Sequence, residues 1–462
     1  MNRPVHNGLE PARRGQPPPI VIVWRCRRSD GRPTRHACHH LDASRRNPFT
    51  MTSASAAEVP PPNPLARAPR KPYRSISEGL AGHRNSLGVL RLVLAGLVII
   101  SHAFPLGGWG EDPMLGWTKY QESIGGLAVV GFFAISGYLI AKSGAGVDIL
   151  QFLWRRVLRI FPAFWLVLIV GAVIVGPIVW LLDGNRPGGY LVNWGAGGPV
   201  GYIVLNADLT MRQWGIHDIF IDTPWGQHTG SSALNGSLWT LAYEWSCYLI
   251  IAVLVVLGVL KRARWVVLLV TLFYFGVAVS TYVVPGLAAS VIPQFGDRFR
   301  ITLPLIFLIG ACFAMYSRSI PLNDILGVFS GIVVVASLAF GGWIFVGFPA
   351  FAYLLLWAAA RLPEWMQWIG AKNDYSYGVY VYGFLVQQFT SYLGWHHWGY
   401  IPWVLATVVV TGACAWLSWH LVEKRAMQLK DFGPGRGLRY WFGWARQRFS
   451  RNSEKIKAAP QD

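Results

Sequence analysis

Long apolar runs are the feature that most limits how this chain can fold. Ten segments are apolar enough to predict membrane-crossing helices, since a helix needs about 20 apolar residues to cross the hydrocarbon. The composition agrees, because 53% of the 462 residues are hydrophobic and only 14% are charged. The sequence therefore predicts an all-α membrane protein with about ten transmembrane helices. Their expected positions are 87–106, 126–142, 161–182, 238–260, 265–283, 301–316, 322–340, 342–360, 376–394 and 401–422.

The formal net charge of +19 is concentrated at the two ends of the chain. Residues 1–86 contain 15 Lys or Arg with 5 Asp or Glu, and residues 424–462 contain 10 with 3. Basic tails that flank a membrane domain are typical of segments kept on the cytoplasmic face, next to anionic lipid headgroups. The connections between the expected helices show the same bias. We therefore expect both termini in the cytoplasm and no nucleic-acid partner.

The composition changes along the chain predict three regions. Residues 1–84 are rich in Arg and Pro and predict a disordered basic tail, in which Met51 is an alternative translation start. Residues 85–425 form the expected transmembrane domain. Residues 426–462 form a basic cytoplasmic tail, in which 438–449 predict an interfacial helix.

Two connections differ from the short ones. Residues 148–160 alternate apolar and basic positions, which predicts an amphipathic helix on the cytoplasmic surface. Residues 183–237 form a long outer loop, where contacts with an acceptor molecule are expected.

The segment RLVLAGLVIISHAF, residues 91–104, places two ionisable side chains in an apolar run. Eleven residues advance a helix by about three turns and 16 Å, so Arg91 and His102 share one face at different depths. Arg91 would lie near the cytoplasmic boundary, where an arginine that only extends to the headgroups is an equally good interpretation. His102 would lie in the outer half of the bilayer, where an ionisable group favours a functional role over simple helix packing.

Glu244 is the second charge inside an expected membrane helix. It would lie one to two turns below the outer surface, near the depth of His102, and a carboxylate beside an imidazole fixes its tautomer. Such a pair could remove a proton from a hydroxyl or activate the imidazole as a nucleophile. An ion pair that only packs helices together is the structural alternative.

Two further motifs carry weaker signals. GFFAISGYLI, residues 131–140, contains Ser136 and Gly137, small residues that allow close approach of a helix or a slender ligand. WRRVLRIFPAFW, residues 154–165, places Arg156 and Arg159 on one helix face, as phosphate binding requires. Charge that only orients the helix explains the arginines as well. Cys26, Cys38, Cys247, Cys312 and Cys414 show no metal-binding spacing, so no metal is expected.

These motifs together resemble the acyltransferase 3 family of integral membrane acyltransferases. The similarity also includes SLWTLAYEWSCYL, the later DYSYGVYVYGFLVQQ at 374–388 and the closing LVEKR, and it extends over about residues 85–425 in the family's order. Many members have a histidine at the end of the later motif, where this chain has Gly383. The role of that histidine therefore cannot be carried over to this chain.

The resemblance implies a ten-helix acyltransferase of the bacterial inner membrane. It implies acyl-CoA as a cytoplasmic donor substrate, no permanently bound cofactor, and a carbohydrate or glycolipid acceptor on the far side. His102 takes the place of the family's essential histidine, with Arg91 as its arginine partner and Glu244 as the helix-borne glutamate. Arg156 and Arg159 match the arginines expected at the donor phosphates, with Ser136 and Gly137 along the donor path.

The expected function is therefore O-acyl transfer, most simply O-acetyl transfer, to a hydroxyl of a lipopolysaccharide or another cell-envelope or secreted polysaccharide. The residues allow direct transfer with His102 as base, and also a covalent acyl-histidine. The alternative from another class is a proton-coupled transporter or flippase, with His102 and Glu244 as its proton relay. An inactive relative is less consistent with retention of several costly intramembrane charges.

Overall fold

A computed structural model describes residues 74–82, 85–192, 195–370 and 373–457. Most of the predicted N-terminal tail, including Met51, lies outside the described residues. The end of that tail is ordered, however. β1 (Arg74–Ser75) pairs antiparallel with β2 (Pro321–Leu322), and α1 (Ile76–Gly79) follows it. Because Ile76 is fully buried, packed structure already includes residues ahead of the expected boundary at 85.

Helices form most of the described structure, and six are long and apolar enough to cross a membrane. These are α2 (Leu87–Leu106), α4 (Ile124–Gly144), α5 to α6 (Ile149–Leu182), α12 (Arg264–Val283), η3 with α16 (Trp343–Arg361), and α18 to η7 (Tyr400–Asp431). Shorter apolar helices are α10 (Thr240–Val256), α14 (Phe299–Met315) and α15 (Asp324–Phe340). The chain is therefore a helical, multi-pass membrane protein. Ten crossings and two cytoplasmic termini stay predictions.

Every one of the ten expected apolar segments coincides with a helix, the last two with α17 (Ser376–Tyr392) and α18. The helix expected at 148–160 is confirmed, but it is not separate from the next membrane helix. α5 (Ile149–Ile169) runs without a break through that segment into η1 (Val170–Val175) and α6 (Gly176–Leu182). Asp148 caps its first turn, accepting from the backbone N–H of Gln151 at 3.0 Å. The basic positions of this segment are therefore the first turns of one long helix, and their place at the cytoplasmic surface stays a prediction.

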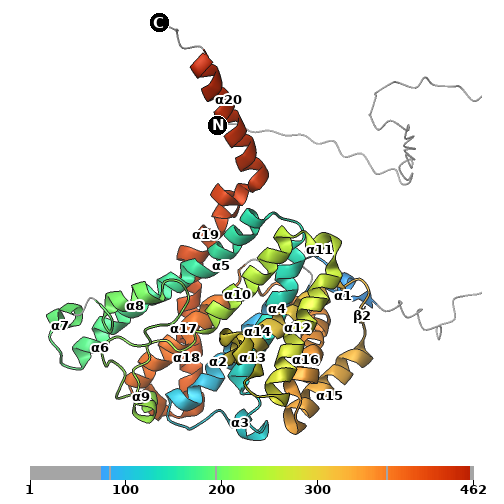
Figure 1. Ribbon diagram of the computed structural model, residues 1–462. Helices are drawn as coiled ribbons and strands as arrows, with labels where there is room; N and C mark the ends of the chain where they lie inside the picture. The colour runs from blue at the N-terminus through green and yellow to red at the C-terminus, as the bar shows by residue number, and fades with distance from the viewer. Residues whose placement is uncertain (1–73, 83–84, 193–194, 371–372, 458–462) are drawn as a thin grey trace, which may run out of the picture. The chain divides into compact units, whose positions relative to one another are not determined.

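Short helices cover the connections. The long loop contains α7 (Pro187–Val192), α8 (Pro199–Asn206) and α9 (Pro224–Thr229). Other connections contain α3 (Pro113–Trp117), α11 (Val259–Arg262), α13 (Leu287–Val291) and η2 (Pro293–Gly296). α3 and α9 lie at one end of the bundle, and α1 and α11 lie at the other (Figure 1). The stretch predicted as an interfacial helix is helical, within α20 (Leu438–Lys457).

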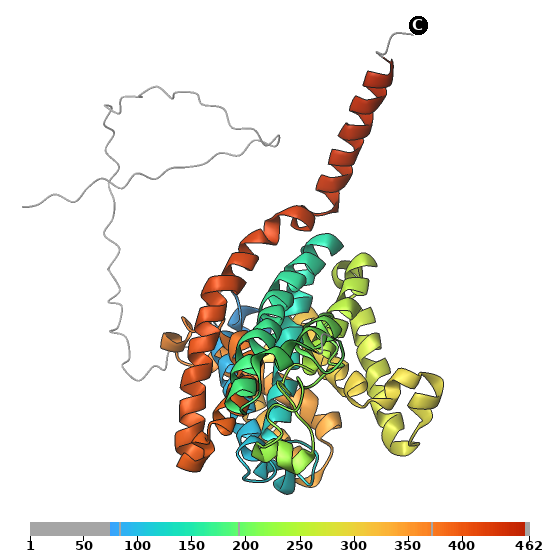
Figure 2. The ribbon, with the colours of Figure 1, turned by 90° about the vertical axis from the view of Figure 1, so that its left-hand side faces the viewer.

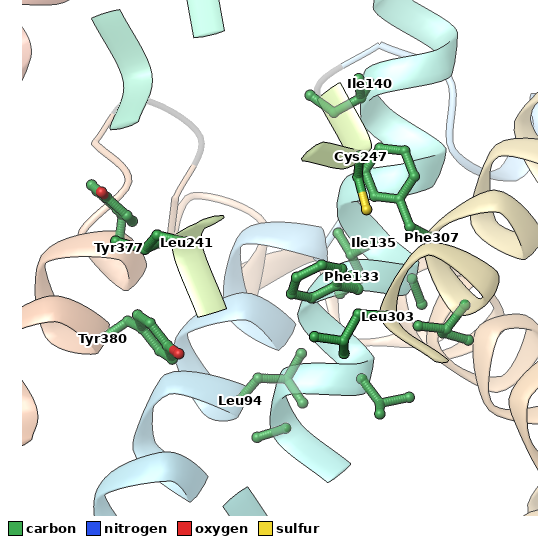
Figure 3. Close-up of a cluster of buried hydrophobic side chains, with 14 of the residues drawn as sticks. Leu94, Phe133, Ile135, Ile140, Leu241, Cys247, Leu303, Phe307, Tyr377 and Tyr380 are labelled. Carbon is green, nitrogen blue, oxygen red and sulfur yellow. The ribbon is translucent and has the colours of Figure 1, made fainter. Parts of the chain in front are cut away.

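The centre of the bundle is a close contact between α4 and α14. A Cβ at Gly137 would lie 1.9 Å from the backbone oxygen of Phe307, and a Cβ at Gly310 would lie 2.1 Å from that of Ala134. These two glycines let the helix backbones touch. Figure 3 shows the buried side chains around this contact, which come from α2, α4, α10, α14 and α17.

The remaining helices surround this centre. α2 packs against α4 and α17, and α17 also packs against α18, while α12 packs against α14. α12 and α18 consequently lie on opposite sides of the bundle (Figure 2). α5 contacts α10, α17 and the segment η6 (Trp419–Glu423). This arrangement brings α2, α5, α10 and α17 together around the candidate site.

Candidate active site

A shared carboxylate joins three helices at the end of the site where Arg91 lies. Asp374, just before α17, forms ion pairs with Arg91 of α2 and with Arg159 of α5, the latter at 2.5 Å. Its second oxygen accepts hydrogen bonds from the backbone N–H and the hydroxyl of Ser376. Burial alone would raise the pKa of Asp374, but Arg159 and Arg91 outweigh that effect and hold it well below the usual range. Arg91 is therefore part of an ion-pair cluster and does not only extend toward headgroups.

Next to this cluster lies a basic pocket of about 210 Å³. Its lining residues are Arg155, Arg156, Arg159, Met427, Lys430 and Asp431. Arg155 pairs with Asp431 at 3.1 Å. Arg156 donates to the Ser143 hydroxyl at 3.1 Å, and no acidic side chain in the described part of the chain forms an ion pair with it. A cation without an acidic partner is what binding of a phosphate group requires.

A narrow cavity of about 40 Å³ follows deeper in the bundle, and Arg91, Ser136, Arg159 and Glu244 contribute to its wall. Glu244 accepts a hydrogen bond from the Tyr248 hydroxyl at 2.5 Å and from Ser136 at 3.4 Å. We name this space the middle cavity.

The expected pairing of Glu244 with His102 is not observed. Depth alone suggested it, but α10 packs against α4, α5 and α14, which turns Glu244 toward the middle cavity. His102 lies in the wall of a different space, a cavity of about 700 Å³ that we name the large cavity. Its Nδ1 is buried and has no hydrogen-bond partner among the described residues, and its ring meets Phe384 edge-on at 5.2 Å.

The acidic residue beside this part of α2 is Asp112. It accepts a hydrogen bond from the Ser101 hydroxyl at 2.5 Å, and further ones from the backbone N–H groups of Met114 and Ile124 at 2.9 Å. Ser101 precedes His102 in the chain, and both line the large cavity. Asp112 therefore fixes the C-terminal end of α2, where the histidine lies.

The two small residues predicted along a donor path have different surroundings. Ser136 lines the middle cavity. Gly137 does not, because the backbone of α14 occupies the space where its side chain would be. Gly137 therefore serves helix packing and leaves no room for a ligand.

The three spaces share walls. Arg159 lines both the basic pocket and the middle cavity, while Val129 and Tyr380 line both the middle and the large cavity. Tyr380 is held by its hydroxyl, which donates to the Ser237 carbonyl at 2.9 Å and lies 2.5 Å from the Thr240 hydroxyl. Three adjoining spaces thus lie in a row, of which the first is lined by Arg156 and the last by His102.

Sequence reasoning missed Asp374, Tyr248 and Asp112. Asp374 carried a signal, because it is an acid directly at the start of a predicted membrane helix. Tyr248 lies one turn from Glu244 on the same face of α10, so helical spacing could have indicated it. Asp112 is in a connection whose folding against α2 has no signature in the sequence.

Comparison with known proteins agrees with this architecture. A family model described as an acyltransferase domain matches residues 84–420. An "O-acetyl transferase" of Shigella phage Sf6 is 32% identical over 356 residues, which cover 74% of this chain and 95% of that protein. "Nodulation protein 10" of Rhizobium leguminosarum bv. viciae is 27% identical over 383 residues, which cover 77% and 96%. No solved structure matches. With the family model covering most of its membrane domain, the chain belongs to the acyltransferase 3 family and is an acyltransferase.

Proposed function

We propose that this protein transfers an acyl group, most simply acetyl, from acyl-CoA to a hydroxyl of a cell-envelope or secreted glycan or glycolipid. It would do so in the bacterial inner membrane, with both termini in the cytoplasm and His102 at the point of transfer. The observation that carries the proposal is the row of spaces from the unneutralised Arg156 to His102. The relative named for O-acetyl transfer supports the choice of group.

The donor's phosphates would bind in the basic pocket. Arg156 and Lys430 provide charge there, and Arg159 is already satisfied by Asp374. The pantetheine arm would pass through the middle cavity, where Glu244 can accept from its amide N–H groups. Because this cavity is narrower than the arm, Tyr248 and Tyr380 must turn aside as the donor enters. The rise of about 16 Å between Arg91 and His102 is a length that an extended pantetheine can cover.

In the direct route, the acceptor oxygen attacks the thioester carbonyl while His102 takes the hydroxyl proton. The tetrahedral intermediate then collapses, the C–S bond breaks, and the CoA thiolate leaves and takes up that proton. In the covalent route, the neutral imidazole of His102 attacks first, the C–S bond breaks, and the CoA thiolate leaves with the proton that the acylated imidazole loses. The acceptor hydroxyl then attacks the acyl-imidazole, the C–N bond breaks, and the hydroxyl proton returns to the imidazole. A single turnover with radioactive acetyl-CoA, quenched in the absence of acceptor, distinguishes the routes. Only the covalent route leaves a radioactive acetyl group on the protein.

The test is transfer of label from radioactive acetyl-CoA by purified protein in liposomes. The acceptor is envelope polysaccharide from the strain that carries the gene, freed of ester groups by mild alkali. We expect transfer by the wild type and a loss of at least about 100-fold in His102→Ala, the usual contribution of general base catalysis. His228→Ala is the matched control, since that histidine is exposed in the long loop.

Undiminished transfer by a folded His102→Ala protein would remove His102 from the mechanism. Absence of any transfer by the wild type, to this polysaccharide or to the glycolipid fraction of the same cells, would contradict the proposed function itself. Mass spectrometry of glycans from a deletion strain gives an independent result, because a missing acetyl mass identifies the group and the acceptor together.

A further inference from the structure

The large cavity contains a carboxylate that the proposed mechanism does not use. Glu122, in the connection between α3 and α4, lines this cavity together with His102. One of its oxygens accepts from the Trp343 indole N–H at 3.0 Å, and the other accepts from the backbone N–H of Ser123 at 3.3 Å. No ion pair to Glu122 occurs within the described ranges of the chain. It is thus a half-buried acid without an ion-pair partner among the described residues.

The carboxylate is held in a fixed place. A Cβ at Gly126 would lie 1.8 Å from its Oε1, so only glycine at that position leaves room for it. Trp343 is itself 2% exposed and packs edge-on against Phe348. Each carboxylate oxygen can accept two hydrogen bonds and receives one from the protein. Glu122 therefore has acceptor capacity left over in a cavity wall.

The rest of the wall suits a carbohydrate. The volume of about 700 Å³ is within the range of small-molecule sites, which are mainly apolar and aromatic with a few fixed polar groups. The aromatic side chains of the wall are Tyr120, Trp239, Tyr282, Phe295, Phe299, Trp343, Phe345, Phe348 and Tyr380. Aromatic faces pack against the C–H face of a sugar ring, and its hydroxyls need polar partners. The ionisable side chains of the wall are His102, Glu122 and Arg298.

From these contacts we propose that the large cavity is the binding site of the acceptor sugar and that Glu122 accepts a hydrogen bond from one of its hydroxyls. This inference rests on the proposed function and adds a specificity-determining residue to it. The proton on the reacting hydroxyl still goes to His102, and Glu122 holds a neighbouring hydroxyl so that the reacting one faces the thioester.

Burial raises the pKa of Glu122 to about 6, although the Trp343 hydrogen bond and the charge of Arg298 act in the opposite direction. Asp112 adds to the rise, and the imidazole of His102 faces the same cavity. An ionised carboxylate accepts more strongly than a neutral one. Acceptor binding by the wild type should therefore strengthen as the pH rises through about 6. Since His102 is present in every variant used below, a difference between variants reports on Glu122.

The experiment measures transfer from radioactive acetyl-CoA to the alkali-treated polysaccharide, with each substrate varied in turn. We expect Glu122→Gln to raise the KM for the polysaccharide about tenfold, the worth of one hydrogen bond to a charged group. The KM for acetyl-CoA should stay within about twofold, since the donor binds elsewhere, and the inflection near pH 6 should disappear. Glutamine keeps an acceptor oxygen for Trp343, so the fold is retained. Glu364→Gln is the control, because Glu364 is an exposed acid that lines none of the three spaces.

A second variant tests the hydrogen bond between Trp343 and the Glu122 carboxylate. Trp343→Phe removes the N–H that favours the ionised carboxylate, so the inflection in the acceptor KM should move to higher pH. A purely structural Glu122 would instead lower the thermal stability and raise the KM for both substrates without moving the inflection. Wild-type transfer together with an unchanged acceptor KM in Glu122→Gln would overturn this inference alone. No transfer by the wild type would be a failure of the proposed function.

Discussion

At the scale of single residues, one carboxylate determines how two of the predicted arginines can act. Asp374 binds Arg91 and Arg159 at once, and the side chains of the three are 16–19% exposed. Without Asp374, Arg91 would have no ion-pair partner among the described residues and Arg159 would keep only Glu423, at 4.0 Å. Poorly solvated charge would then be left without full compensation. The arginines expected at the donor therefore depend on an acid from a helix far away in the sequence.

Asp374→Asn should accordingly destabilise the folded protein by roughly 3 kcal/mol. Thermal unfolding in detergent measures the change. Asp324→Asn is the matched control, because Asp324 pairs with Arg361 on the surface, where 66% of its side chain is exposed, and such pairs contribute less than about 1 kcal/mol. Equal losses of thermal stability in the two variants would show that the Asp374 cluster contributes no more than a surface ion pair.

The lowered pKa of Asp374 also predicts a dependence on pH. A carboxyl whose pKa is depressed in the folded protein stabilises it above its unfolded pKa, about 3.9, and this contribution is lost as the pH falls through the folded value. The stability difference between wild type and Asp374→Asn should thus be constant at neutral pH and shrink below about pH 4. A difference that persists unchanged in stronger acid would contradict the ion-pair interpretation.

At the scale of elements, the contact of α4 with α14 shows what glycine contributes to this bundle. The space beside Gly137 is filled by backbone, which cannot rotate away as a side chain could. Neighbouring helices must therefore separate to accept even one methyl group. Interiors that are already closely packed accommodate such additions at a cost of about 1–3 kcal/mol.

Gly137→Ala should lower thermal stability by that amount, and the yield of monodisperse protein on size-exclusion chromatography should fall. Gly96→Ala in α2 is a matched control, because nothing lies within 4 Å of a Cβ built there. Alanine has the higher helix propensity, so this control should be neutral or slightly stabilising. A Gly137→Ala protein as stable as the control would mean that the helices adjust freely.

Helix positions were predictable to within a few residues, because apolar runs of this length have one stable conformation in a bilayer. The separate helix expected at 148–160 shows the limit of such patterns. An amphipathic stretch has the same periodicity whether it lies on the surface or continues into the membrane. Only packing of α5 against α10 and η6 distinguishes the two.

The site was predictable in its residues but less so in its pairings. His102, Arg91, Arg159 and Glu244 were identified because charges inside apolar runs are conspicuous. Which of them meet depends on how the helices are rotated, and that information lies in contacts between distant segments. The partners found in the structure, Tyr248 for Glu244 and Asp374 for the arginines, are examples.

At the scale of the whole molecule, the three adjoining spaces form a path through the bundle with one narrow point. The middle cavity of about 40 Å³ has room for only a few water molecules. Tyr380 forms its wall toward the large cavity, and its hydroxyl is tied to α10 and to the segment before it. The side chains of Tyr380 and Val129 therefore separate the middle cavity from the large cavity.

Tyr380→Ala should enlarge this narrow point and let potassium escape from loaded liposomes faster than the wild type does. Tyr380→Phe is the control, because it keeps the ring and loses only the hydroxyl. An ion electrode measures the release directly. If Tyr380→Ala liposomes retain potassium as well as the wild type, another side chain must close the path.

The narrow point has a consequence for cellular energy. A bilayer that stores an electrochemical gradient cannot contain an open pore, yet the function proposed above requires that a group from one aqueous compartment be presented to a molecule in the other. A tyrosine that closes the empty path, and a donor that fills the path whenever the tyrosine has turned aside, would keep the membrane insulating throughout turnover. The protein could then carry an acyl group across the membrane without dissipating the electrochemical gradient.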